Sequence, residues 1–143
     1  MIGLEPRISI VTLGVDDMKR AREFYERLGW TAAESSNENV TFFNLGGMIF
    51  GLYGREALAE DAQVEFSKAS FSGVSLAHNC ASEEQVDAVM AFAEKAGAKV
   101  VKQPQKVFWG GYSGYFSDPD GHLWEIAYNP FFPLDEDGRI TAP

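Results

Sequence analysis

Residues 92–97 read FAEKAG and repeat the pattern of residues 24–29, FYERLG, with Phe, Glu, a basic residue and Gly at matching places. Each segment is typical of an amphipathic helix that ends in a left-handed glycine cap. The segments before them, 11–15 (VTLGV) and 76–80 (LAHNC), align as strands when the second helix is three residues longer. Two amphipathic helices can agree by chance, but here the order of strand, helix, glycine and three further strands also recurs. We therefore infer an internal duplication of two half-size modules that share one core.

The first module is predicted as βαβββ. Residues 8–15 are β-branched and apolar, which indicates a buried strand, and the carboxylates of Asp16 and Asp17 mark a helix start. The helix is expected over residues 17–28, because apolar side chains recur every three or four positions before Gly29. Turn signals, namely a polar stretch and a Gly-Gly pair, separate three expected strands at 31–34, 40–45 and 48–53.

The second module repeats this order after a polar linker, residues 54–70, which could hold a short helix near 56–61. A strand at 73–80 precedes the sequence SEEQ at 82–85, a capping box that starts a helix ending at Gly97. The remaining strands are expected at 99–101, 112–116 and 123–128, and DPDG at 118–121 is typical of a type I turn. The predicted fold class is α+β.

Length and composition exclude several classes of protein. The 143 residues fit one domain, and 45% hydrophobic residues are too many for a disordered chain. No apolar stretch approaches the ~20 residues of a membrane span, and a formal charge of -9 argues against nucleic-acid binding. One cysteine and two histidines exclude a disulfide framework and a Cys/His zinc cluster within one chain. We expect a cytoplasmic protein whose partners are neutral or cationic small molecules.

Three motifs resemble the vicinal oxygen chelate superfamily, which includes glyoxalase I, bleomycin-resistance proteins and extradiol dioxygenases. They are a strand ending in Val-x-Asp (Val15, Asp17), a helix closing in Phe-Tyr-x-x-Leu-Gly (24–29) and a late Asp-Pro-Asp-Gly-x-x-x-Glu (118–125). The resemblance implies two βαβββ modules that form a curved mixed sheet around a cleft. The domain would span 7–130, with modules at 7–53 and 71–128, linker 54–70 between them, and a C-terminal tail at 131–143. We interpret the acidic residues 135–137 as part of a solvated tail.

The resemblance also implies a divalent metal held by His and Glu from the first and last strands of each module. Glu125 matches the last-strand glutamate, but the other places hold Ile10, Phe50, and either Ser75 or His78. Ile and Phe cannot bind a metal, so we expect no resident metal or other cofactor. A reduced site of Glu125, His78 and water stays as an alternative. Strand alternation instead favours His78 as a core residue beneath the helix.

The remaining candidates form a ligand pocket. Residues 108–116 interleave aromatic side chains with glycines, which suits a wall against a flat or apolar ligand. Phe108 and Phe116 are assigned to the core of the module. The predicted ligand-binding residues are Phe43, Phe50, Tyr53, Ser75, Trp109, Tyr112 and Glu125. Glu125 is also the one candidate catalytic residue, as an acid or base.

We therefore expect a protein that binds a small organic molecule in an aromatic cleft without the usual metal. Two alternatives stay open: a metal-dependent lyase or dioxygenase of the glyoxalase type that uses Glu125, and a metal-free acid/base enzyme. The paired rings of Phe131 and Phe132 either fold back on the domain or dock on a second subunit, and a homodimer is expected.

Overall fold

The structure is a computed structural model that describes residues 3–4, 6–67, 71–72 and 74–143. The chain forms two compact units, Met1–Lys68 and Ala69–Pro143, each of which is taken by itself below. Each unit combines helical structure with a mixed sheet, so the predicted α+β class is confirmed. No helix in the described ranges is both long and apolar enough to span a bilayer.

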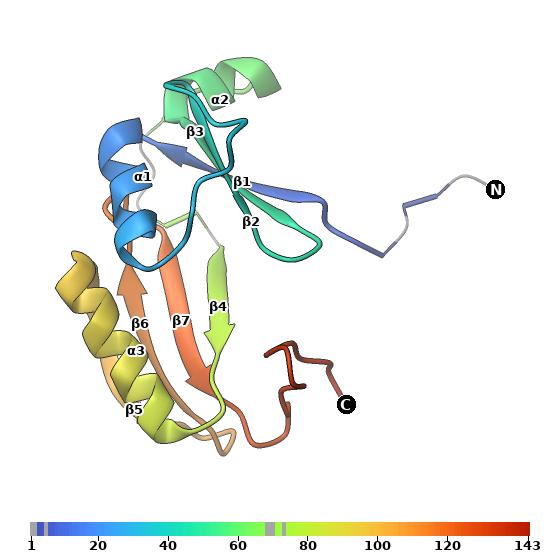
Figure 1. Cartoon of the computed structure of the whole chain (residues 1–143), viewed down its shortest axis with the longest axis vertical. Coiled ribbons are helices and arrows are strands. Elements are labelled where there is room, and N and C mark those ends of the chain that lie inside the picture. Colours follow the sequence, from blue (N-terminus) through green and yellow to red (C-terminus); the bar gives the residue numbers. More distant parts are fainter. Residues whose placement is uncertain (1–2, 5, 68–70, 73) are drawn as a thin grey trace. The chain divides into compact units, whose positions relative to one another are not determined.

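The first unit holds a three-stranded sheet and two helices (Figure 1). Its order is β1-β3-β2, in which β3 pairs parallel with β1 and antiparallel with β2. The elements are β1 (Ile10–Val15), α1 (Met18–Arg27), β2 (Val40–Asn44), β3 (Ile49–Gly54) and α2 (Arg55–Ala62), and α2 is the short helix expected near 56–61.

The strand predicted at 31–34 does not form. One isolated bridge, between Ala32 and Phe43, stands in its place. The reason is local, since the N–H of Ser36 donates to the Ala33 carbonyl and turns the chain before a ladder can grow. Along its described residues, this unit is therefore βαββ followed by a helix.

Helix α1 begins and ends where the sequence indicates. The Asp17 side chain caps it by accepting from the backbone N–H of Arg20 at 3.0 Å, and Gly29 follows with a φ of 109°. The buried face of α1 presents Tyr25, which packs on the rings of Phe43 and Phe50 from the sheet. This aromatic cluster is the core of the first unit.

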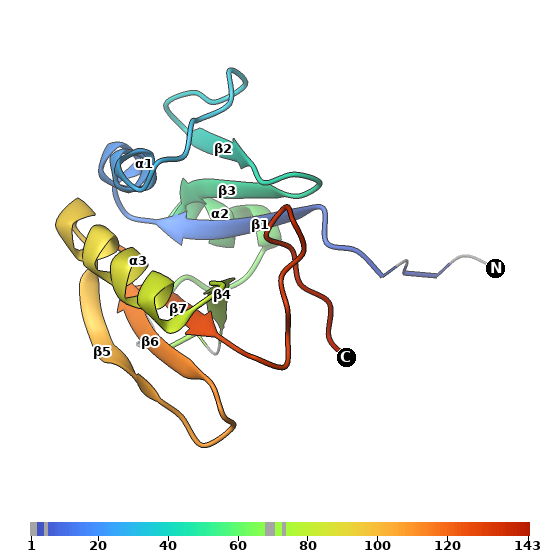
Figure 2. The same ribbon diagram turned by 60° about the horizontal axis from the view of Figure 1, so that its bottom comes forward.

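The second unit holds a four-stranded sheet of order β4-β7-β6-β5, with one helix packed against it (Figures 1 and 2). Strand β7 pairs parallel with β4 and antiparallel with β6. Its elements are β4 (Ser75–Asn79), α3 (Glu83–Ala96), β5 (Lys99–Lys106), β6 (Tyr112–Ser117) and β7 (Leu123–Tyr128).

Helix α3 confirms the predicted capping signals. Ser82 Oγ accepts from the N–H of Gln85 at 3.1 Å, while Gln85 Oε1 accepts from the N–H of Ala81. Gly97 ends the helix in the left-handed region. Strand β5 is longer than the predicted 99–101 and has irregular register with β6. At this irregularity a Cβ on Gly114 would lie 2.8 Å from the Lys102 carbonyl oxygen, so the close approach requires glycine.

The two Asp-x-Asp-Gly sequences fold into the same turn. In the hairpin between β6 and β7, Asp118 Oδ1 accepts from the N–H groups of Asp120 and His122, both at 2.9 Å. Asp135 Oδ1 likewise accepts from Asp137 and Arg139 at 2.9 Å. An isolated bridge between Leu134 and Ile140 continues this second turn. Residues 134–140 thus form a C-terminal hairpin, in which residues 135–140 are exposed to solvent.

Candidate functional site

The Glu125 carboxylate lies in a row of residues that crosses the second sheet. The strand register places Glu125 of β7 between Ala77 of β4 and Tyr115 of β6, and Tyr115 in turn faces Lys102 of β5. Side chains of directly paired residues share a face of the sheet. The row therefore presents a carboxylate and a phenol side by side, with a small residue on one flank and an ammonium group on the other.

This row lies on the face of the sheet that is turned away from α3. The opposite face carries Phe116 and Trp124, whose rings stack with centroids 6.2 Å apart. Tyr112 shares the face of Phe116, and its hydroxyl donates to Asp87 of α3 at 2.7 Å. Because Tyr115 and Glu125 alternate with Phe116 and Trp124, they face away from the helix.

Electrostatics couple Tyr115 to Glu125. Burial raises the pKa of Tyr115, and the charge of Glu125 and a hydrogen bond to its carboxylate raise this pKa further. The Tyr115 hydroxyl is therefore a protonated donor at neutral pH. Glu125 is half-buried and, among the described residues, forms no ion pair.

Sequence reasoning missed Tyr115, although a signal for it exists. The hairpin has a three-residue loop: the N–H of Asp118 donates to the His122 carbonyl, and Gly121 has a φ of 86°. A type I turn followed by a left-handed glycine is the known form of such a loop. That register places Tyr115 directly opposite Glu125, whereas a two-residue turn would shift the pairing by one position.

Ser75 and His78 lie on opposite faces of β4. Ser75 shares the face of Ala77 and Glu125, and it is exposed. His78 pairs with Ile126 and so points to the other face, where partial desolvation lowers its pKa. A site that combines Glu125 with His78 is therefore wrong, because the sheet separates the two side chains. His78 is also exposed, which contradicts its assignment to the core.

The aromatic candidates of the first unit divide between two faces. Phe43 and Phe50 are each 1% exposed, and both pack on Tyr25 and Trp30. This burial gives the two rings a packing role, and we do not keep them among the proposed ligand contacts. Tyr53 is half-buried and alternates with Leu52, so it points away from that aromatic cluster.

The register also corrects which residue of the first unit corresponds to Glu125. Gly51 pairs with Thr12 and Phe42, as Glu125 pairs with Ala77 and Tyr115. When 11–15 is laid over 76–80, the counterpart of Glu125 is therefore Gly51, and Phe50 corresponds to the buried Trp124. The overlay of Phe50 on Glu125 was shifted by one position, which changes the face.

The loop 107–111 between β5 and β6 holds Trp109. Its ring lies so close to Gly111 that a Cβ on Gly111 would overlap the ring. This contact matches the expected packing of an aromatic ring beside a glycine. Phe108 is fully exposed at the tip of the loop, so its assignment to the core is wrong, whereas Phe116 is buried as predicted. The structure does not bring Tyr112 to the face of Glu125, because its hydroxyl bonds to Asp87 of α3.

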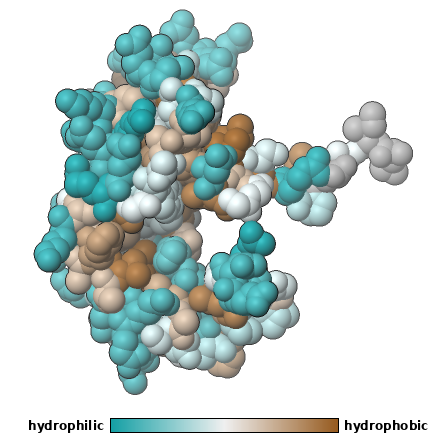
Figure 3. Space-filling view, in the orientation of Figure 1, coloured by the Kyte–Doolittle hydropathy of each residue, from teal (hydrophilic) through white to brown (hydrophobic). Residues whose placement is uncertain are grey.

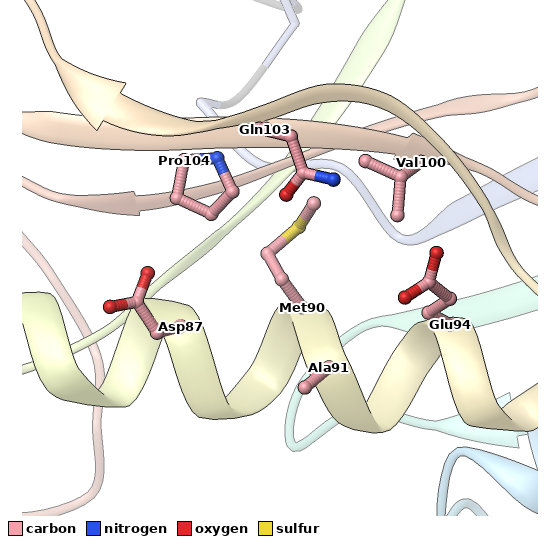
Figure 4. A pocket seen from close by; sticks show the side chains of 7 residues that line it. All are labelled: Asp87, Met90, Ala91, Glu94, Val100, Gln103 and Pro104. Carbon is pink, nitrogen blue, oxygen red and sulfur yellow. The ribbon is translucent and has the colours of Figure 1, made fainter.

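Cavities outside the row include two within the second unit. A groove of about 220 Å³ lies between α3 and the edge strand β5 (Figure 4). A cavity of about 270 Å³ is bounded by the end of β7 and the C-terminal segment, including Phe132 and Leu134. Cys80 lies on its wall, is 3% exposed, and has a pKa raised by desolvation. Both the burial and the raised pKa lower the reactivity of that thiol in the folded state.

Comparison with known proteins identifies the family. The chain matches the sequence model of the Glyoxalase/Bleomycin resistance protein/Dioxygenase superfamily over residues 7–126. It belongs to this superfamily. The crystal structure of a glyoxalase-related enzyme from Fulvimarina pelagi is 33% identical, covers 97% of this chain and 100% of its own, and superposes with a TM-score of 0.87.

Two further superfamily members are similar over most of the chain. A family enzyme from Burkholderia phytofirmans PsJN is 25% identical, with a TM-score of 0.75 over 84% of this chain and 96% of its own. The metallothiol transferase FosB of Shouchella clausii is 29% identical over 120 residues, which are 83% of this chain and 77% of that protein.

Membership of this superfamily raises the question of whether the residues present fit a metal. Within residues 3–4, 6–67, 71–72 and 74–143, no three His, Cys, Asp or Glu side chains are grouped so as to hold an ion. The neighbours of Glu125 in its row are an alanine and a tyrosine. One carboxylate does not supply the three or four donors that a divalent transition metal requires, so the residues of this sheet do not fit the metal.

Proposed function

We propose that this superfamily member binds a small organic molecule on the face of the second sheet that carries Glu125, without a resident metal. The half-buried Glu125, which forms no ion pair among the described residues, carries this proposal. Partial burial of a carboxylate costs free energy unless a donor or a positive charge meets it. Tyr115 supplies one donor, and a cationic or N–H group of a ligand would supply a further one.

The surroundings of Glu125 favour a ligand with a cationic or N–H group. Ser75 and Ala77 are small and exposed, so they leave room beside the carboxylate on the β4 side. The phenol of Tyr115 offers an aromatic surface on the β6 side, and aromatic rings attract organic cations. The net charge of -9 adds long-range attraction for such ligands.

A metal-dependent enzyme is the second candidate. It rests on the FosB relative, whose name states a metal-dependent thiol transfer, at 29% identity over 83% of this chain. An acid/base role for Glu125 without metal is the third. The hydrogen bond from Tyr115 supports it, because a donor keeps the carboxylate oriented. In both cases Glu125 would be the residue on which activity depends.

Thermal melts with a matched pair of probes test the binding proposal. Benzylamine should raise the melting temperature of the wild type, by an amount that grows with the logarithm of its concentration. Benzyl alcohol, which has the same ring without the charge, should not. Glu125→Gln should abolish the effect of benzylamine, while Glu84→Gln on the surface of α3 should keep it. An equal effect of the amine on Glu125→Gln would contradict the proposal.

Metal analysis separates the candidates. Under the binding proposal, the purified protein holds no stoichiometric metal, and Mn²⁺, Ni²⁺ or Zn²⁺ leaves its melting temperature unchanged. A bound metal that is lost in Glu125→Gln would favour the metal-dependent enzyme instead. Turnover of a compound that needs Glu125 but no metal would favour acid/base catalysis.

We also propose that the protein is a cytoplasmic homodimer. The exposed rings of Phe108 and Phe131 support self-association, since a Cβ on Gly110 would touch the Phe131 ring, which places that ring beside the tip of the loop 107–111. Light scattering should give twice the mass of the chain, and Phe108→Glu should lower it. A monomeric wild type would contradict the dimer without affecting the binding proposal.

A further inference from the structure

The groove between α3 and β5 has an apolar floor and a carboxylate at each end. Met90 lies at its centre and points toward Gln103, while Val100 and Pro104 border it on the β5 side (Figure 4). Asp87 and Glu94 project from α3 on either side of Met90 and turn toward β5. The groove lies on the α3 side of the sheet, opposite the face of Glu125.

We propose that this groove is a second binding site, which takes an aliphatic diamine or polyamine segment along α3. The two ammonium groups would meet Asp87 and Glu94, and the methylene chain would lie over Met90. This inference is independent of the proposed function, because it uses different residues on the other face.

The helix sets the spacing of the two carboxylates. Seven residues separate Asp87 from Glu94, which is about 10 Å along the axis at ~1.5 Å per residue and nearly two full turns. The side chains therefore project from the same side of α3, as Figure 4 shows. An extended chain of roughly five to eight methylenes can span this separation when each ammonium lies within hydrogen-bond distance of a carboxylate.

The sequence of α3 places no basic side chain three or four residues from either carboxylate. On a helix, an acidic side chain pairs with a basic one four residues away, but the residue four positions after Asp87 is Ala91. Among the described residues, neither Asp87 nor Glu94 forms an ion pair. No Lys or Arg of the described chain lines the groove, and Lys102 of β5 belongs to the row on the other face.

One end of the groove is held in place. The Tyr112 hydroxyl donates to Asp87 Oδ1 at 2.7 Å, which leaves Oδ2 for a ligand. That hydrogen bond raises the pKa of Tyr112, with burial and the charges of Asp87 and Glu83 adding to it. An ammonium group beside Asp87 would offset the negative charge and lower the pKa of Tyr112, so this tyrosine reports on occupancy.

A nuclear magnetic resonance titration with 1,7-diaminoheptane tests the site. The amide signals of residues along the groove should shift with one binding curve, and heptylamine should bind about two- to fivefold more weakly, because one exposed ion pair is lost. Asp87→Asn and Glu94→Gln should each weaken diamine binding by a similar factor. Glu84→Gln, an exposed acid on the same helix outside the groove, should leave it unchanged.

Two further comparisons decide the outcome. Ethylenediamine is too short to reach both carboxylates, so equal binding of the short and long diamines would overturn the proposal, as would shifts spread over all acidic surfaces. The phenol pKa of Tyr112, taken as the difference between wild type and Tyr112→Phe, should fall on addition of the long diamine. Diamine binding that persists in Glu125→Gln is assigned to this groove. If the groove binds no diamine, this proposal fails, and the benzylamine test of the Glu125 face is unaffected.

Discussion

Glu125 owes its chemistry to its neighbours across the strands. In sequence it follows Trp124 and precedes Ile126, both of which are buried on the α3 side. Alternation along one strand predicts that Glu125 points the other way. The register then supplies Tyr115 on one side and Ala77 on the other. The half-buried carboxylate next to a phenolic donor, on which our binding proposal rests, is formed by two strands together.

Gly114 provides a test at the scale of one residue. A Cβ at this position would lie 2.8 Å from the Lys102 carbonyl oxygen and 2.9 Å from the Pro104 nitrogen, and both are backbone atoms that cannot turn away. We expect Gly114→Ala to cost about 1–3 kcal/mol, as overpacking does, and to lower the melting temperature by several degrees.

Gly51→Ala is the matched control for this substitution. It also adds a methyl group to a buried strand glycine, but the nearest atoms, on Thr12 and Phe42, would be at ordinary contact distances of 3.4 and 3.6 Å. Its melting temperature should stay close to that of the wild type. Equal melting temperatures for the two variants would contradict the close approach of β5 to Gly114.

At the scale of elements, the two Asp-x-Asp-Gly turns have different structural roles. The turn at Asp118 sets the register of β6 and β7, and so it positions Tyr115 against Glu125. The turn at Asp135 closes the C-terminal hairpin, whose preceding residues line the cavity beside Cys80. The same type of turn thus positions Tyr115 against Glu125 in one place and closes the hairpin beside Cys80 in the other.

Opening the second turn should expose the thiol. Asp135→Ala removes the acceptor of two backbone hydrogen bonds, so the hairpin frays and Cys80 gains access to solvent. We expect several-fold faster labelling by a thiol reagent, which is specific because the chain has one cysteine. Asp137→Ala removes the same charge but keeps the Asp135 carboxylate as acceptor. Cys80 in this variant should be labelled at the wild-type rate. Equal rates for both variants would contradict the protective role of the turn.

At the scale of the whole molecule, the excess of acidic residues determines the electrostatics. The formal charge of -9 spreads over a surface on which hydrophilic side chains cover much of the face in view (Figure 3). Within the described residues, the ion pairs include Arg22 with Glu26 at 3.5 Å and Arg55 with Asp16 at 3.3 Å. Pairing every basic side chain with an acidic one would still leave a net charge of -9, which repels itself in the folded state.

Salt should relieve this repulsion. Raising NaCl from about 0.02 to 0.3 M shortens the screening length from roughly 20 Å to about 6 Å, so the free energy of unfolding should rise and the melting temperature should increase by a few degrees. Sucrose at matched osmolality controls for solvent effects that do not depend on charge. A melting temperature that falls with salt would show that attractive ion pairs outweigh the repulsion.

The sequence by itself determined the α+β class, the two helix caps, the Asp-Pro-Asp-Gly turn and the superfamily. All of these depend on side chains a few residues apart, and their spacing along the chain is their spacing in space. It also determined that Glu125 faces away from Trp124, because alternation is a local property.

Only the tertiary structure decided which residues meet across strands. It placed Tyr115 beside Glu125 and made Gly51, not Phe50, the counterpart of Glu125. These outcomes depend on loop geometry and register, where a shift of one position reverses every face. The loop 119–121 sets the register of β6 and β7, whereas contacts between distant segments set the registers of the parallel pairs β4–β7 and β1–β3.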